Sequence, residues 1–260
     1  MNECLLVEKD EKGIVILTLN RPSSANALNT LLLQTLSETL DRLRHEPDVR
    51  AVILTSAGNR IFCAGADLKE RKGMDQNTVS KTVALIGETV QRVEAIPFPV
   101  IAAMNGSAFG GGLELALACD MRIASEQGQY GLTETSLAII PGAGGTQRLP
   151  RIIGTARAKE LIFTARRLGA LEGYSIGLFN KTVPVEAVFE EAYRLAEMIA
   201  ANGPIAIQQA KKAIDTGLQA DLQSGLKIEN ICYSATIPTS DRVEGLAAFA
   251  EKRKPNYKGE

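Results

Sequence analysis

Two glutamates beside glycine-rich turns are the residues of this sequence that could do acid–base chemistry. Glu114 follows the glycine run 110–112, and Glu134 precedes a second glycine-rich stretch at 141–145. A pair of carboxyl groups can take a proton at one atom and deliver a proton at another, which is the chemistry of adding or removing water. Consecutive glycines let the backbone approach a ligand closely and direct N–H groups at a developing negative charge on oxygen. The two motifs together predict acid–base chemistry on a carbonyl compound.

The surroundings of the two glutamates differ. Glu114 lies in a segment, 113–118, whose other residues are all apolar. Burying a carboxylate costs several kcal/mol unless it is paired, solvated or neutralised, so Glu114 is either a functional acid or one stabilised by a helix N-terminus or by Arg148. The sequence favours the functional interpretation. Glu134, between two threonines, fits an exposed acid at a helix start as well as a catalytic acid.

The segment 62–69 is predicted to be a turn from a strand into a helix, with small residues at its apex. In a functional interpretation, the N–H of Ala66 and the N–H of Gly111 together form an oxyanion hole for a thioester oxygen. In the alternative interpretation this is an ordinary tight turn, in which Asp67 caps the following helix. The turn by itself does not decide between the two.

Nucleophilic and metal-dependent mechanisms find little support. Cys63 lies in the same turn, but a nucleophilic thiol needs a base, and the single histidine, His45, lies in a charged helix end. The four cysteines are scattered without a Cys-x-x-Cys motif, so neither a disulfide framework nor a metal site is expected. The glycine-rich stretches also lack the endings of nucleotide-binding loops.

Composition and charge argue against a nucleic-acid-binding, membrane or secreted protein. The net charge is −1 and the pI is about 6.1, so the chain has no basic field that would attract nucleic acid or anionic lipid. Apolar stretches are too short to span a bilayer, and the N-terminus resembles no secretory signal. The protein is therefore predicted to be soluble and cytoplasmic, with no nucleic-acid and no membrane partner.

Strand and helix patterns alternate through the first 183 residues, which predicts an α/β fold. Buried strands are expected at 13–19, 49–55, 99–104 and 121–124. Helices are expected at 28–43, starting near Asn26, and at 79–93 and 113–119. Beyond residue 184 only helices are expected, at 188–201, 205–218, 222–235 and 242–252.

Several motifs give the chain a resemblance to the crotonase (enoyl-CoA hydratase/isomerase) superfamily along nearly its whole length. The matching segments, in the order typical of that superfamily, are 20–22, 26–28, FCAGADLKE at 62–70, AFGGGLELALACD at 108–120, ETSLAIIPGAGGTQRL at 134–149, and the tail 241–253. The resemblance implies a crotonase spiral of repeated ββα units over residues 1–195, followed by a C-terminal helical trimerisation segment over 196–260. It also implies homotrimers, commonly paired as a dimer of trimers.

The resemblance assigns catalytic roles to four positions. It implies that the N–H groups of Ala66 and Gly111 polarise the thioester carbonyl of an acyl-CoA. Glu114 would orient and activate water, and Glu134 would exchange the proton at Cα. Isomerases of the superfamily generally keep an acid at the position of Glu134 but not at that of Glu114, so the presence of both favours a hydratase.

The coenzyme A moiety of the substrate is expected to contact a second set of residues. By resemblance these are Ala64, Asp67, Lys69 and Lys252, the last at its own or at a neighbouring subunit's site. Two positions depart from relatives that contact CoA there: Ser23 replaces a lysine, and Cys232 replaces a phenylalanine.

The function implied by the resemblance is reversible syn hydration of a 2-enoyl-CoA. No metal or redox cofactor is expected, since coenzyme A enters as part of the substrate. Within the superfamily the chain is most similar to methylglutaconyl-CoA hydratases, which suggests 3-methylglutaconyl-CoA as one substrate. An enoyl-CoA isomerase and a non-catalytic RNA-binding or assembly protein remain as alternatives. The expected helix at 28–44 contains no lysine, which argues against RNA binding.

Overall fold

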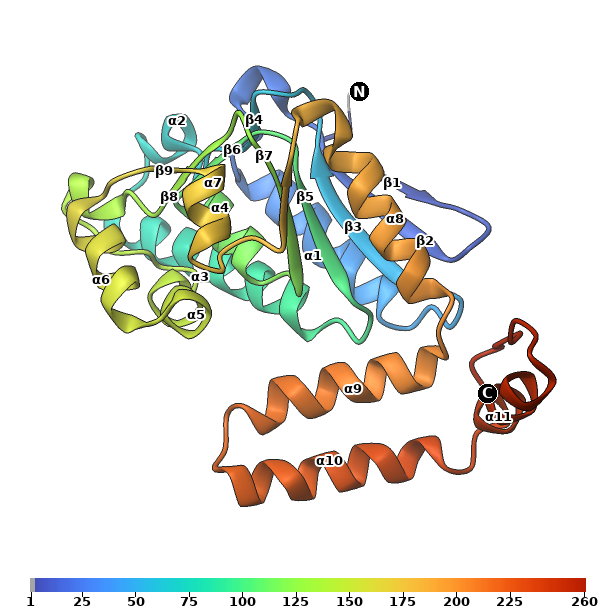
Figure 1. Cartoon of the computed structure of the whole chain (residues 1–260). Coiled ribbons are helices and arrows are strands. Elements are labelled where there is room, and N and C mark those ends of the chain that lie inside the picture. The colour runs from blue at the N-terminus through green and yellow to red at the C-terminus, as the bar shows by residue number, and fades with distance from the viewer. Residues whose placement is uncertain (1–2) are drawn as a thin grey trace.

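The computed structural model describes residues 3–260, which form two parallel-rich sheets surrounded by helices (Figure 1). The larger sheet has the strand order β1 (Leu5–Lys9), β2 (Ile14–Leu19), β3 (Ala51–Ser56), β5 (Val100–Met104), β7 (Met121–Ser125) and β10 (Lys181–Val183). The smaller sheet has the order β4 (Ile61–Cys63), β6 (Ser107–Phe109), β8 (Gln129–Gly131) and β9 (Leu168–Gly169). Only the pairs β1–β2 and β8–β9 are antiparallel among these.

Successive strand pairs divide between the two sheets. The first strand of each pair β3–β4, β5–β6 and β7–β8 joins the larger sheet, and the second joins the smaller one. Helical segments then follow each pair, so the chain advances as a repeated ββα unit. The predicted spiral is confirmed, and the same geometry places the ends of β4, β6 and β8 side by side.

The remaining elements are helices. The α-helices are α1 (Thr30–Leu43), α2 (Leu68–Arg71), α3 (Gln76–Ala95), α4 (Gly111–Leu117), α5 (Gly145–Ile153), α6 (Thr155–Thr164), α7 (Ala170–Ser175), α8 (Val188–Ala200), α9 (Pro204–Gly217), α10 (Leu222–Thr236) and α11 (Ser240–Glu251). Three short 3-10 turns are η1 (Pro22–Ser24), η2 (Glu134–Leu137) and η3 (Val185–Ala187).

Both faces of the larger sheet are covered, which explains why its strands are continuous apolar runs. On β3, Val52 and Leu54 face the main core formed with α1, α3 and the smaller sheet. Ile53, on the opposite face, packs in a second cluster beneath α8. The four predicted strands agree closely with β2, β3, β5 and β7, whereas β1, β10 and the short strands of the smaller sheet were not predicted.

The start of α1 differs from the prediction. The helix is capped by Asn29, whose Oδ1 accepts a hydrogen bond from the N–H of Leu32 at 3.1 Å. Asn26 instead adopts a left-handed conformation with φ 51° and is buried. Its side chain accepts from the N–H of Arg21 and donates to the carbonyl of Ile61, so it ties two loops together rather than capping a helix.

The last three helices project from the rest of the chain as an arm, α9–α11 (Figure 1). Helices α9 and α10 pack closely where Gly217 meets Gly225. Helix α9 is attached to the sheet by an ion pair of 2.7 Å between Lys211 Nζ and Asp120 Oδ2. The predicted domain division at residue 195 falls within α8, whereas the connection to the arm lies at 201–203. No helix within residues 3–260 combines the length and the apolar character needed to cross a membrane.

Candidate active site

Glu114 lies on α4 and is only 2% exposed. Its Oε1 accepts two backbone hydrogen bonds, from the N–H of Ala143 at 2.8 Å and from the N–H of Gly145 at 2.7 Å. Oε2 accepts no hydrogen bond from residues 3–260. Burial raises the pKa of Glu114, while these two amides, the charge of Arg148 and the amide of Gly142 act in the opposite direction. One oxygen is thus fixed, and the other remains available to a ligand.

Glu134 begins the 3-10 turn η2 and is partly buried. Its Oε2 is buried and has no hydrogen-bond partner within the described part of the chain. Burial raises the pKa of Glu134 to about 7, and the negative charge of Glu114 adds to the rise. A carboxyl group with a pKa near 7 can both give and take a proton at neutral pH. Glu134 is therefore not an exposed acid at a helix start, which was the alternative interpretation.

Gly110 brings the two glutamates to one place. The N–H of Glu114 donates to the carbonyl of Gly110 at 2.9 Å, so α4 starts from this residue. A Cβ atom on Gly110 would lie 2.9 Å from Glu134 Oε1, and its φ of 49° is unfavourable for other residues. The absence of a side chain at Gly110 therefore allows the Glu134 carboxyl group to pack against the start of α4.

The amides of Ala66 and Gly111 lie next to each other. A Cβ atom built on Gly111 would be 3.7 Å from the nitrogen of Ala66, and one on Gly65 would be 3.1 Å from the nitrogen of Gly111. Gly111 is the first residue of α4, where an N–H has no partner in its own helix. Neither amide donates a hydrogen bond within residues 3–260, so both are available to one oxygen atom of a ligand.

The turn that carries Ala66 is fixed by Asp67. Asp67 Oδ1 accepts from the N–H of Lys69 and from that of Glu70, which caps α2. Asp67 Oδ2 accepts from Arg21 Nη2 at 3.0 Å. Both carboxylate oxygens of Asp67 therefore accept hydrogen bonds, which confirms that Asp67 caps the helix. This role is compatible with the oxyanion-hole interpretation, because the same turn holds the Ala66 amide next to that of Gly111.

The predicted CoA-binding residues divide into two groups. Ala64, Asp67 and Lys69 lie on the same turn and on α2, with Lys69 exposed. Lys252 follows α11, and Figure 1 places α11 at the opposite end of the molecule from α2 and α4. Within one chain the structure therefore brings Lys69, but not Lys252, to the two amides.

Alternative chemistries lack a basis in the geometry. Burial raises the pKa of the Cys63 thiol to about 12, and its turn contains no histidine. His45 is exposed at the end of α1. Among residues 3–260 no cluster of three or more His, Cys, Asp or Glu side chains could hold a metal ion. Acid–base chemistry by the glutamate pair is what the arrangement supports.

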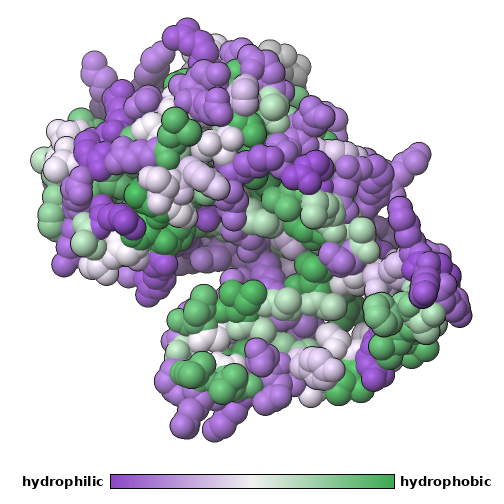
Figure 2. Space-filling model, in the orientation of Figure 1, coloured by the Kyte–Doolittle hydropathy of each residue, from purple (hydrophilic) through white to green (hydrophobic). Residues whose placement is uncertain are grey.

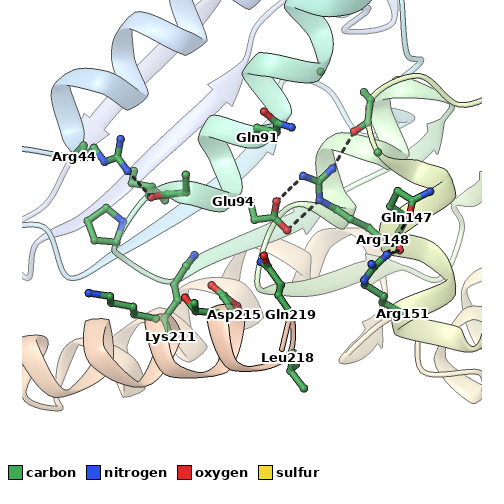
Figure 3. Close-up of a pocket in the computed structure, with 18 of the residues that line it drawn as sticks. Arg44, Gln91, Glu94, Gln147, Arg148, Arg151, Lys211, Asp215, Leu218 and Gln219 are labelled. Atoms are coloured by element: carbon green, nitrogen blue, oxygen red, sulfur yellow. Dashed lines mark hydrogen bonds and ion pairs between the residues drawn. The ribbon is translucent and has the colours of Figure 1, made fainter. Parts of the chain in front are cut away.

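The contacts of Arg148 and Glu94 were not predicted from the sequence. Arg148 was offered as one residue that could stabilise Glu114, and against the effect of burial its charge does lower the pKa of Glu114. Its side chain donates to the carbonyl of Ala143 and to both oxygens of Glu94, not to Glu114 itself. Glu94 lies on α3, far from Arg148 in the sequence, and no local motif indicates this pair. Arg148 and Glu94 also line a polar cavity of about 1190 Å³ between α3, α5 and α9 (Figure 3).

Comparison with known proteins assigns the family. The sequence profile of the family described as enoyl-CoA hydratase/isomerase matches residues 9–260. The chain is 52% identical over 259 residues to YngF of Bacillus subtilis (strain 168), provisionally named an enoyl-CoA hydratase/isomerase, with 100% of both chains covered. It is 48% identical over 258 residues to the mitochondrial methylglutaconyl-CoA hydratase of Homo sapiens, covering 98% of this chain and 76% of the relative.

A solved structure agrees with the sequence relatives. The crystal structure of an enoyl-CoA hydratase from Bacillus anthracis superposes with a TM-score of 0.98 at 53% identity, covering 99% of this chain and 100% of the other. The chain belongs to the enoyl-CoA hydratase/isomerase family, as the sequence motifs predicted.

Proposed function

We propose that the protein is an enoyl-CoA hydratase, which adds water reversibly across the 2,3 double bond of a 2-enoyl-CoA thioester. The observation that carries this proposal is the pair of carboxyl groups beside two unpaired backbone amides. The environment of Glu114 differs from that of Glu134, since only Glu114 accepts backbone hydrogen bonds from another segment. Pairs of acids held in different environments are suited to separate acid and base roles.

The amides would act on the thioester. When the acyl-CoA carbonyl lies against the N–H groups of Ala66 and Gly111, the negative charge that develops on its oxygen faces two donors already in position. Each such donor contributes roughly 3–4 kcal/mol of transition-state stabilisation. Polarisation of the carbonyl in turn makes C3 of the enoyl group electrophilic.

The glutamates would act on water and on the α carbon. Glu114 holds one oxygen on the amides of Ala143 and Gly145 and uses Oε2 to accept a proton from the attacking water. Glu134, protonated in part because its pKa is raised to about 7, delivers a proton to Cα. Both groups lie beside the same turn at Gly110, so addition occurs on one face of the double bond.

The residues of the 64–69 turn would contact the CoA moiety, with Lys69 facing its phosphates. Lys252 would reach the site of a neighbouring subunit, since α11 lies far from α2 in its own chain (Figure 1). No metal or redox cofactor is required by these steps. We expect that dialysis against EDTA leaves the hydration rate unchanged, and a loss restored by a divalent metal would contradict this.

We also propose a homotrimer, with residues 196–260 as its oligomerisation segment and pairing of two trimers as a further step. Large apolar side chains are exposed over the arm, including Leu218, Leu222 and Phe249 at 82%, 78% and 86% (Figure 2). Exposed apolar side chains gathered on one part of a molecule are typical of subunit contacts. A mass in solution equal to one chain would contradict the assembly.

A cytoplasmic location accompanies the proposal. The four cysteines are unpaired, and thiols persist in a reducing compartment. Cell fractionation tests this location, and recovery with an extracytoplasmic fraction would contradict it.

One proposed substrate is 3-methylglutaconyl-CoA, because of the similarity to the human methylglutaconyl-CoA hydratase. The test is a panel of initial rates with crotonyl-CoA, 3-methylglutaconyl-CoA and a 3-enoyl-CoA. We expect hydration of the first two and turnover of the third no faster than either. Double-bond migration without water uptake as the fastest reaction would instead identify an isomerase.

A further inference from the structure

The loop 142–145 holds Glu114, and its own conformation requires support. Oε1 of Glu114 depends on two N–H groups of this loop, those of Ala143 and Gly145. Three of its four residues are glycine, and Gly144 adopts φ 99°. A chain segment of this composition has little conformational preference of its own, so contacts from outside must fix it.

Arg148 provides those contacts. Its backbone N–H donates to the carbonyl of Gly144 at 2.8 Å. Its side chain then turns back over the loop, and Nη1 donates to the carbonyl of Ala143 at 2.9 Å. A Cβ atom on Gly144 would lie 2.1 Å from Nη1, so this path of the guanidinium requires glycine at 144.

Glu94 anchors the guanidinium from a different helix. Oε1 of Glu94 accepts from Arg148 Nε at 3.2 Å, and Oε2 accepts from Nη2 at 2.6 Å, which is a bidentate pair (Figure 3). A bidentate arginine–carboxylate pair fixes orientation as well as charge. Ala143 is therefore held at both ends: its N–H binds Glu114, and its carbonyl binds an arginine that is anchored to α3.

We infer that Arg148 and Glu94 form a clamp that positions Glu114, with Arg148 acting through Ala143 as a positioning residue rather than a catalytic one. The inference rests on the proposed function for its effect on rate, because Glu114 acts there on water. Its structural part, the fixing of the loop, is independent of the reaction. The charge of Arg148 also lowers the pKa of Glu114 against the effect of burial.

The structural part is tested by hydrogen–deuterium exchange of the peptide that contains 142–148 in the intact protein. In Arg148→Met, the amides of Ala143 and Gly145 should exchange at least about 10-fold faster, because the loop opens more often. Glu94→Gln should give a smaller change of the same sign. Arg151→Met is the matched control, since Arg151 lies on the same helix but bonds only to Gln147.

The kinetic part is tested by a double-mutant cycle. Because a displacement of about 1 Å can cost about 10²-fold, Arg148→Met should lower kcat by roughly 10–100-fold with KM changed less than about 3-fold. In the Glu114→Gln background the same change should have almost no effect on kcat, since it acts through Glu114. Arg148→Lys should restore part of the loss, and Arg151→Met should behave as wild type.

Two results would overturn the clamp. One is an exchange rate of the loop in Arg148→Met and Glu94→Gln equal to that in Arg151→Met. The other is an equal loss of kcat with and without Glu114. If Arg148→Met does not fold, Glu94→Gln decides both measurements, because Glu94 is half exposed and its replacement leaves α3 intact. A wild-type protein without hydratase activity, but with the predicted exchange behaviour, would refute the proposed function and leave the clamp standing.

Discussion

The spiral core and the C-terminal arm bury their apolar residues in different ways. In the core the larger sheet is covered on both faces, and every side chain of the strands β3 and β5 is buried. In the arm, helices α9, α10 and α11 expose residues such as Leu218 and Phe249 to solvent (Figure 2). The apolar residues of the core are buried within one chain, whereas many of those in the arm remain exposed, as the proposed assembly would require.

This difference also separates the chemistry from the assembly. The glutamate pair, the two amides and the loop that holds Glu114 all lie in the core. The arm carries Lys252, the proposed CoA contact that follows α11, and α11 lies far from α2 in this chain (Figure 1). Variants of the core should therefore affect catalysis and stability, whereas variants of the arm should affect the subunit count.

The largest effect is expected for the carboxyl groups. Glu114→Gln and Glu134→Gln keep size but remove proton transfer, which contributes about 10²–10⁴-fold. We expect each to lower kcat for hydration at least about 10²-fold with little change in KM, and the double variant to cost less than the product of the two. Steady-state kinetics on crotonyl-CoA measures this, with Glu126→Gln on the β7–β8 loop as control. Near-normal hydration by Glu114→Gln would contradict the hydratase assignment.

Gly112 in the core should be far less tolerant of a methyl group than Gly203 in the connection to the arm. A Cβ atom on Gly112 would lie 2.2 Å from the carbonyl oxygen of Cys63, whereas one on Gly203 would find its nearest neighbour, Ala206, at 3.9 Å. Gly112→Ala should cost at least about 3 kcal/mol and lower the unfolding midpoint by at least about 6 °C. Gly203→Ala should change the midpoint by about 1 °C. Calorimetry of both variants measures the contrast, and equal midpoints would refute it.

Substitutions of exposed apolar residues in the arm should change the oligomeric state of the protein. Replacing Leu218 and Phe249 together by serine should shift the mass in sedimentation toward a single chain, because both side chains are mostly exposed in the monomer and would be buried in a trimer. Circular dichroism should remain that of the folded core. Leu31→Ser, an exposed apolar position on α1, is the control and should keep the wild-type mass. A variant with unchanged mass would show that these residues lie outside the subunit contact.

The smallest effect concerns pH. The pKa of Glu134 is raised to about 7 from its ordinary value of 4.5, so the folded state binds more protons than the unfolded state between these pH values. This group therefore contributes stability that is complete below about pH 4.5 and is lost as pH rises through about 7. For hydration, in which Glu134 donates its proton, kcat/KM should also fall as pH rises through about 7.

Comparison of Glu134→Gln with wild type measures the contribution to stability. The slope of unfolding free energy with pH over this interval should be less negative in the variant. Identical slopes would show that Glu134 is not the group that titrates there.

Sequence patterns alone predicted the fold class, the four central strands β2, β3, β5 and β7, most of the helices, and the family. Continuous apolar runs and helical periodicity are local patterns that can be recognised in the sequence alone. The apolar runs are long and uninterrupted because both faces of the larger sheet are buried. The motifs around Glu114 and Glu134 are local as well. Glycine runs and an acid among apolar residues can be seen in the sequence, so these motifs indicated acid–base chemistry without a structure. The position of Lys252 relative to a site was not determined by these patterns.

How the two motifs meet could be seen only in the folded chain. Gly110 seats the Glu134 carboxyl, the amides of Ala143 and Gly145 hold Glu114, and Arg148 pairs with Glu94 from another helix. Each of these contacts joins segments that are distant in the sequence, and no local propensity encodes them. They follow from the spiral, which brings the ends of β4, β6 and β8 side by side and so collects its turns into one site.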